Sequence, residues 1–262
     1  MTGNDIPAPA FRPQPRDILV ALALLTRLPL PYADFAPNDP RPAAHAAWAY
    51  PLVGLVVGAL SVLAAFAALS FGLPTGIAAL FALLASVVST GAMHEDGLAD
   101  CADGFWGGWT KERRLEIMKD SQIGTYGVIA LVLSFGLRWG ALSALIATGG
   151  MMTALLSAAV ISRAGMVLVM AYLPHARATG LSHQTGKPPR NAALCAGGLA
   201  AAALALLIPA PLFGSISAVA FAMVLTTFIA KAKIGGQTGD VLGATQQLIE
   251  ITVLLVCLSA LP

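Results

Sequence analysis

Charged residues are scarce in this sequence. They make up 11% of the 262 residues, whereas hydrophobic residues make up 57% and the mean hydropathy is +0.78. Soluble domains usually contain about 25% charged residues, so the composition excludes a soluble globular protein and indicates an integral membrane protein. The formal net charge is only +2, and we expect no nucleic acid among the partners.

Cysteine is also rare. Cys101, Cys195 and Cys257 are far apart and form no CxxC or Cys/His pattern. This excludes a disulfide framework and argues against a zinc site.

The start of the chain lacks the basic, apolar and small-residue pattern of a cleaved signal peptide. We expect residues 1–16 to form a flexible N-terminal arm in the cytoplasm. Residues 17–262 are then expected to form a single membrane catalytic domain.

Long stretches lack charge altogether. No charged residue lies between His45 and His94, and the sequence LPTG at 73–76 divides this run into two apolar stretches. Each approaches the ~20 residues that a membrane-spanning helix needs. With the later stretches they predict an all-α, polytopic helical bundle of about seven transmembrane helices, near 47–71, 77–93, 123–148, 151–173, 191–208, 212–230 and 241–261. The shorter segment 18–30 contains Arg27, which indicates an interfacial or re-entrant piece.

Lys and Arg are confined to alternate connections. The connections at 94–122, 174–190 and 231–240 contain several, whereas those at 72–76, 149–150 and 209–211 contain none. The positive-inside rule places the charged connections in the cytoplasm. We therefore expect a multi-pass protein of a bacterial-type inner membrane with its active site on the cytoplasmic side.

Four of the thirteen acidic residues are concentrated in the sequence HEDGLADCADGFWGG at 94–108: Glu95, Asp96, Asp100 and Asp103. If 94–104 continues the preceding span as a helix, residues 96, 100 and 103 fall within an arc of about 60°. Three carboxylates this close repel one another unless a cation lies between them, and their oxygens suit Mg²⁺. Asp96, Asp100 and Asp103 are thus the predicted metal ligands. Glu95 points elsewhere, and either supports the ligands or acts as a base. A solvated acidic helix end is the alternative.

Further candidates lie in the other polar segments. Lys119 and Asp120 adjoin a glycine-containing helix entry that could bind an oxyanion. Thr238 and Asp240 lie beside three glycines and could bind metal or phosphate oxygens, although a glycine-rich turn with an Asp helix cap would give the same pattern. Glu250 lies about three turns inside the last span, where a carboxylate usually has a function. We also expect Lys231 to contact the ligand, and Arg163 to pair with an acid of the site, whereas Arg138 is structural.

Three ordered motifs resemble those of the membrane cobalamin-5′-phosphate synthases, or adenosylcobinamide-GDP ribazoletransferases. They are EDGLADCADG at 95–104, MKDSQIGTYG at 118–127 and GGQTGDVLGA at 235–244, and the likeness extends over nearly the whole chain. Gln122 departs from the pattern, because we expect this family often to have Arg there.

The resemblance implies a transferase of cobalamin nucleotide-loop assembly. A hydroxyl of α-ribazole or its 5′-phosphate would attack the phosphate on the cobinamide arm, releasing GMP and giving adenosylcobalamin or its 5′-phosphate. Mg²⁺ and Lys119 would neutralise the diphosphate, and Asp103 or Glu95 would accept the proton. The implied partners are these substrates, the lipid bilayer and other enzymes of nucleotide-loop assembly.

Other functions stay open at this point. A Mg-dependent membrane prenyltransferase also binds diphosphate through aspartates on helix ends, and a CDP-alcohol phosphotransferase-like enzyme shares the chemistry. A cation transporter would use Asp96, Asp100 and Glu250 as its ion path.

Overall fold

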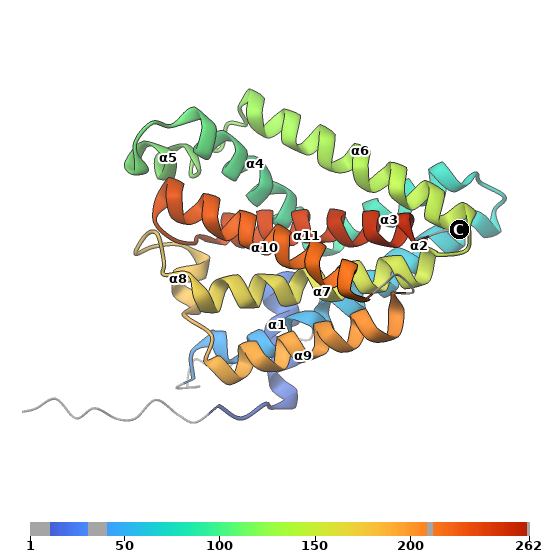
Figure 1. Ribbon diagram of the computed structural model, residues 1–262, viewed down its shortest axis with the longest axis horizontal. Coiled ribbons are helices and arrows are strands. Elements are labelled where there is room, and N and C mark those ends of the chain that lie inside the picture. The colour runs from blue at the N-terminus through green and yellow to red at the C-terminus, as the bar shows by residue number, and fades with distance from the viewer. Residues whose placement is uncertain (1–10, 31–40, 209–211, 261–262) are drawn as a thin grey trace, which may run out of the picture.

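The computed structural model describes residues 11–30, 41–208 and 212–260. All the secondary-structure elements in this part of the chain are helices. This confirms the predicted all-α class. The elements, shown in Figure 1, are α1 (Pro15–Leu25), the 3₁₀ helix η1 (Ala43–Ala49), α2 (Tyr50–Ser70), α3 (Thr75–Thr90), α4 (Met93–Gly107), α5 (Lys111–Ile117), α6 (Thr125–Ala147), α7 (Met151–Tyr172), α8 (Leu181–Thr185), α9 (Arg190–Leu207), α10 (Leu212–Ile234) and α11 (Gly239–Ser259).

The long helices match the apolar stretches of the sequence. Within the described residues, six helices are long and apolar enough to cross a membrane: α2 extended by η1, α6, α7, α9, α10 and α11. The bent pair of α3 and α4 makes a seventh if it is taken as one span. These findings confirm a multi-pass bundle with about seven spans.

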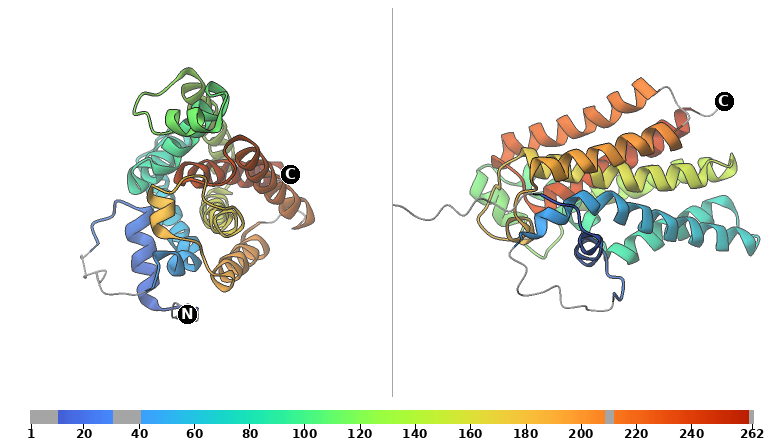
Figure 2. Two further views of the ribbon diagram at one scale, coloured as in Figure 1. Left: turned by 90° about the vertical axis from the view of Figure 1, so that its left-hand side faces the viewer. Right: turned by 90° about the horizontal axis from the view of Figure 1, so that it is seen from below.

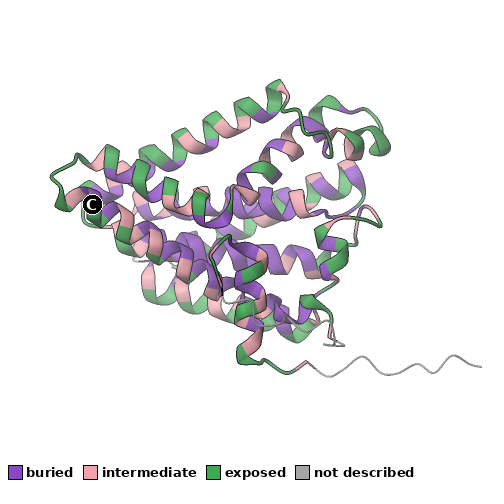
Figure 3. Cartoon of the chain, turned by 180° about the vertical axis from the view of Figure 1, so that it is seen from behind, coloured by how far each residue is buried: buried purple, intermediate pink, exposed green. Residues whose placement is uncertain are grey.

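Helix α7 is the central helix of the bundle. The other long helices surround it in the end-on view of Figure 2 (left), and it is buried over most of its length. The surrounding helices expose large apolar side chains such as Phe66, Leu133 and Phe221, and Figure 3 shows the exposed positions on the outside. Outer surfaces of this kind suit lipid chains, because a bilayer does not penalise exposed apolar groups.

The acidic segment does not continue the second span, which corrects the prediction. Helix α3 ends at Thr90, and α4 begins at Met93 after a bend of 87°. Gly91 and Ala92 both have positive φ values, 66° and 58°, and a left-handed residue ends a helix by turning the chain out of it. The acids therefore lie on a separate helix, α4.

Helix α1 lies across the bundle. In the right-hand view of Figure 2 it is seen nearly end-on, whereas the spans run horizontally. Its C-terminal end adjoins the bend between α3 and α4, where the Arg27 amide donates to the Ser89 carbonyl at 2.7 Å. This orientation agrees with the predicted interfacial segment. Residues 1–10 of the predicted arm lie outside the described residues, and α1 begins at Pro15, before the predicted boundary at residue 17.

The charged connections gather at one end of the bundle. Helices α5 and α8, which belong to two of them, lie at the left end in Figure 1. The loop after α7 is joined to the third connection, because the Gln237 amide donates to the Pro174 carbonyl at 2.8 Å and the Ala176 amide to the Gln237 carbonyl at 2.9 Å. The candidate site lies at this end.

Candidate active site

Helices α4 and α11 cross at very short range. A Cβ atom on Gly97 would lie 2.7 Å from the backbone oxygen of Asp240, and one on Gly243 would lie 3.2 Å from the Cα atom of His94. Only residues without a side chain permit this approach. The crossing brings the second acidic motif, with Asp240, against the first.

Three aspartates form what we call the carboxylate face: Asp96, Asp100 and Asp240. Asp96 is exposed, whereas Asp100 and Asp240 are half-buried. The Asp100 carboxylate is close enough to those of Asp96 and Asp240 for each to raise the energy of its charged form. Within the described residues, this face has one ion pair, in which Arg177 Nη2 lies 3.3 Å from Asp240 Oδ2. Negative charge is therefore in excess.

The carboxylate face fits Mg²⁺ in its usual mode of binding. In the described part of the chain, no three Asp, Glu, His or Cys side chains already form a group that could hold a metal ion. Mg²⁺ seldom needs such a cage, because it keeps several waters and takes one or two carboxylates together with substrate phosphates. Hard oxygen donors and unbalanced negative charge both favour this cation.

Asp103 has a different environment from that expected of a metal ligand. Its carboxylate is buried and accepts hydrogen bonds from the amides of Gly124, at 2.7 Å, and Gly127, at 2.9 Å. It thus caps the first turn of α6 from a neighbouring helix, satisfying amides that have no partner within their own helix. A Cβ atom on either glycine would overlap this carboxylate. The contact explains why the motif at 118–127 accompanies Asp103.

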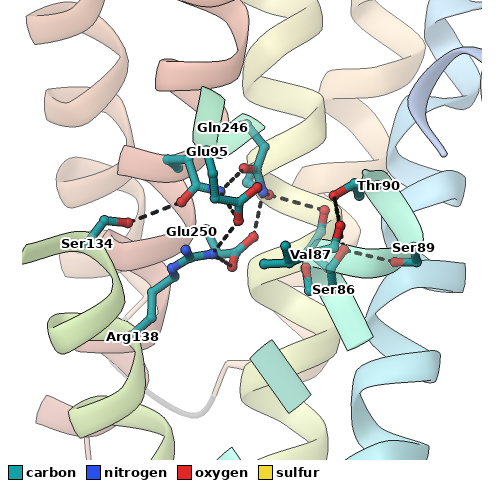
Figure 4. Close-up of polar contacts among 12 residues, drawn as sticks. Ser86, Val87, Ser89, Thr90, Glu95, Ser134, Arg138, Gln246 and Glu250 are labelled. Carbon is teal, nitrogen blue, oxygen red and sulfur yellow. Dashed lines mark hydrogen bonds and ion pairs between the residues drawn. The ribbon is translucent and has the colours of Figure 1, made fainter. Parts of the chain in front are cut away.

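Glu95 and Glu250 belong to a second group, the buried charge network of Glu95, Arg138, Gln246, Gln247 and Glu250. Figure 4 shows the Arg138 side chain reaching the two glutamates. Arg138 Nη1 lies 3.0 Å from Glu95 Oε1 and 3.3 Å from Glu250 Oε1. Gln246 donates to Glu250, and Gln247 donates to Glu95 at 3.2 Å.

This network places the two glutamates away from the roles first considered. Both carboxylates are buried, and one oxygen of each is paired with the Arg138 guanidinium, so both lie in the interior of the bundle and not at its exposed end. The expectation of a structural Arg138 agrees with these contacts. Arg163 makes no ion pair within the described residues, and its Nη1 donates to the Ala159 carbonyl at 3.1 Å.

Of the remaining predicted residues, Lys119, Asp120 and Lys231 are exposed, whereas Thr238 is buried. Lys119 Nζ is exposed and lies 3.4 Å from Thr179 Oγ1, and Asp120 accepts from the amide of Gln122 at 3.1 Å. Lys231 is exposed near the end of α10, and no described residue bonds to its side chain. Thr238 caps α11 and donates to Asp240 at 3.0 Å.

Two residues of this end were not predicted as site residues. Gln237 is buried and joins the loops, since Ser182 Oγ donates to its side-chain oxygen at 2.6 Å and its amide nitrogen contacts His175 Nδ1 at 2.9 Å. Arg177 holds Asp240. In the sequence, the only sign that Gln237 has a structural role is its place in the GGQTGD motif, because a single Gln forms no recognisable pattern.

The chain was compared with known proteins. The family model described as cobalamin-5-phosphate synthase matches residues 17–258. A protein of Bradyrhizobium diazoefficiens named adenosylcobinamide-GDP ribazoletransferase is 43% identical over 245 residues, which cover 92% of each chain. Proteins of the same name from Mesorhizobium japonicum and Azorhizobium caulinodans are each 43% identical over 251 residues, covering 94% and 91% of this chain and 93% and 94% of theirs. No solved structure matches. The chain therefore belongs to the cobalamin-5-phosphate synthase family.

Proposed function

We propose that this protein is an adenosylcobinamide-GDP ribazoletransferase. It joins adenosylcobinamide-GDP to α-ribazole or α-ribazole 5′-phosphate, releases GMP, and forms adenosylcobalamin or its 5′-phosphate. The observation that carries the proposal is the carboxylate face, which offers unbalanced negative charge beside a cavity at the charged end of the bundle. The names of the relatives supply the identity of the substrates.

The chain's own residues divide the work as follows. Asp96 and Asp100, one helical turn apart on α4, would hold Mg²⁺, which would neutralise the charge of the diphosphate. Lys119 and Lys231 add positive charge for the same group at the exposed end of the bundle. Asp240, oriented by Thr238 and Arg177, accepts the proton of the attacking ribazole hydroxyl. The hydroxyl oxygen bonds to the phosphorus on the cobinamide arm as the bond to GMP breaks.

The proposal assigns new roles to three acids. Asp240 replaces Asp103 and Glu95 as proton acceptor, because it is half-buried in the cavity wall, whereas their carboxylates are buried against backbone amides and Arg138. Glu250 contributes to the stability of the bundle rather than to ligand binding.

We also infer that the protein lies in the inner membrane of a bacterial-type cell, with its active site on the cytoplasmic side. Other enzymes of nucleotide-loop assembly are then its partners. The grouping of Lys and Arg at the α5 and α8 end supports this orientation. Labelling a cysteine introduced at exposed Trp109 from each side of sealed vesicles tests it.

The experiment on function measures GMP. Membranes that contain the protein are incubated with adenosylcobinamide-GDP, α-ribazole 5′-phosphate and Mg²⁺. We expect GMP release and a corrinoid product with wild type, and neither with Asp100→Ala. Absence of GMP with wild type, or undiminished GMP with Asp100→Ala, would overturn the proposal. A prenyltransferase would instead release inorganic diphosphate from a prenyl substrate, and a transporter would release neither product.

A further inference from the structure

A cavity lies beside the carboxylate face. Its open space, including the part that is open to solvent, is about 690 Å³. Asp96, Asp240 and Arg177 lie on its polar side. Its apolar walls come from α1, α2, α4 and α7, and include Leu24, Leu25, Tyr50, Met93, Met166 and Met170.

Two polar side chains of the cavity have hydrogen-bonding atoms without a protein partner. His94 is 2% exposed, and neither of its ring nitrogens bonds to any described residue. Arg177 uses Nη2 on Asp240, whereas its buried Nη1 has no partner in the described part of the chain. Buried polar atoms are normally satisfied. Their position in a cavity wall therefore indicates a ligand that supplies hydrogen bonds at these two places.

We propose that this cavity binds the aromatic base of the ribazole acceptor. This inference rests on the proposed function and assigns one substrate to one part of the site. A ribazole is a riboside of a benzimidazole, whose base is flat, uncharged and mostly apolar. Leu side chains and Met thioethers suit such a ring, because sulfur makes favourable contacts with aromatic groups. The base is thereby held against α7.

The polar atoms match the rest of the acceptor. In the riboside, one benzimidazole nitrogen carries the sugar and the other keeps an in-plane lone pair. His94 donates a ring N–H to that lone pair, and Arg177 Nη1 donates to an oxygen of the ribose or its phosphate. The hydroxyl then lies on the side of Asp240, which the proposed function makes the proton acceptor.

The other parts of the substrates fit this cavity less well. Guanine carries several donors and acceptors on its edges, and the Met and Leu walls would leave most of them without partners at a considerable cost. The corrin macrocycle with its side chains is a far larger body than the base. The cavity thus separates the acceptor from the corrinoid and nucleotide parts of the donor.

The test measures binding of two nucleosides to the full chain in detergent. Free α-ribazole and free guanosine are used, so that phosphate contacts do not contribute, and binding is followed by calorimetry. Met170→Phe fills the cavity, and Met152→Phe makes the same change at a 58% exposed position of the same helix. We expect Met170→Phe to weaken α-ribazole binding at least tenfold and guanosine binding less than twofold, with no effect of Met152→Phe.

Two further variants keep the test decisive if Met170→Phe does not fold. His94→Phe removes the donor and is expected to weaken α-ribazole binding roughly 3- to 10-fold. Met170→Ala enlarges the cavity and should shift preference toward ribosides with bulkier bases. Unchanged α-ribazole binding in the folded variants, or weakening of guanosine instead, would overturn the assignment.

The outcomes also separate this inference from the proposed function. If wild type binds α-ribazole in a Met170-dependent way but releases no GMP, the function fails and the cavity assignment stands. If wild type releases GMP and Met170→Phe leaves the KM for α-ribazole unchanged, the assignment fails and the function stands.

Discussion

Glu95 and Asp96 are neighbours in the sequence but lie in different environments, one buried against a guanidinium and the other exposed. Glu95 lies in the buried charge network, where Arg138 contacts it and Glu250. Asp96 lies on the carboxylate face, where the one ion pair found among the described residues joins Arg177 to Asp240 and leaves Asp96 and Asp100 outside it. Arg138, paired with both glutamates, fixes α4, α6 and α11 relative to one another. Unmatched charge at an exposed end calls for a cation and a ligand.

The comparison assigns two functions to one helix. Successive residues of α4 point about 100° apart, so one side of the helix joins α6 and α11 through Glu95, while another carries Asp96, which lines the cavity, and Asp100. The buried side determines where the reactive side lies. Each prediction below separates stability from catalysis, from the largest expected effect to the smallest.

Replacing Arg138 should have the largest effect, and it should fall on stability. Arg138→Met leaves Glu95 and Glu250 buried without a counter-ion, and loss of one member of a buried pair costs about 3–5 kcal/mol. Denaturation in detergent micelles measures the change in the free energy of unfolding. Arg113→Met, which removes an exposed pair with Glu116, serves as the control and should change stability by less than about 1 kcal/mol. Adding Glu95→Gln and Glu250→Gln should restore part of the loss; equal stability of Arg138→Met and wild type would contradict a structural network.

Asp100→Asn should act on catalysis and leave stability intact. If Asp100 is a Mg²⁺ ligand as proposed, its loss should lower the rate of GMP release by roughly 10²–10³-fold, as for other groups that stabilise developing charge. The unfolding midpoint should stay the same or rise, because one repelling carboxylate is gone. Glu116→Gln on the exposed surface of α5 is the matched control. If Asp100→Asn lowers the unfolding midpoint but keeps the wild-type rate of GMP release per folded molecule, Asp100 has a structural role and the account is contradicted.

Gly97→Ala tests the crossing that joins the two groups. Its Cβ atom would lie 2.7 Å from the Asp240 backbone oxygen, so α4 and α11 must separate. We expect a loss of about 1–3 kcal/mol, as for other overpacked sites, together with a raised KM for Mg²⁺. Gly140→Ala on α6, where an added Cβ meets nothing within 4 Å, should be neutral or stabilising. If Gly97→Ala behaves like Gly140→Ala, the close crossing is not needed for the site.

Asp103→Asn gives the smallest effect and decides the role of this acid. The structure predicts the loss of a helix cap, about 0.5–2 kcal/mol, with an unchanged Mg²⁺ concentration for half-maximal GMP release. Denaturation and a Mg²⁺ titration of the rate measure the two quantities. If Asp103 were a metal ligand, the variant would need a higher Mg²⁺ concentration for half-maximal GMP release and would keep its stability.

The sequence predicted those features that depend on local pattern. Runs of uncharged residues located the long helices, and Lys and Arg in alternate connections indicated which connections share an end. The spacing of Asp96 and Asp100 indicated one face of a helix, as found on α4.

Features that depend on which helices pack against one another could not be predicted from local sequence pattern. The bend at Gly91 and Ala92 depends on two left-handed residues, and Ala gives no sign of that conformation. Asp103 was grouped with the other aspartates because residues 96, 100 and 103 share one face of a helix, yet its oxygens accept hydrogen bonds from the amides of Gly124 and Gly127. Arg138 and Glu250 are far from Glu95 in the sequence, so only the packing of α4, α6 and α11 reveals their contact.

Binding of Mn²⁺, a spectroscopic substitute for Mg²⁺, tests the central comparison most directly. The purified protein is titrated in detergent with Mn²⁺ in the presence of adenosylcobinamide-GDP, and free Mn²⁺ is followed by electron paramagnetic resonance. Asp100→Asn is predicted to weaken binding by roughly 10-fold or more, whereas the double variant Glu95→Gln, Glu250→Gln should bind Mn²⁺ as wild type does. Unchanged binding in Asp100→Asn, or binding lost in the double variant while its fold persists, would contradict the account.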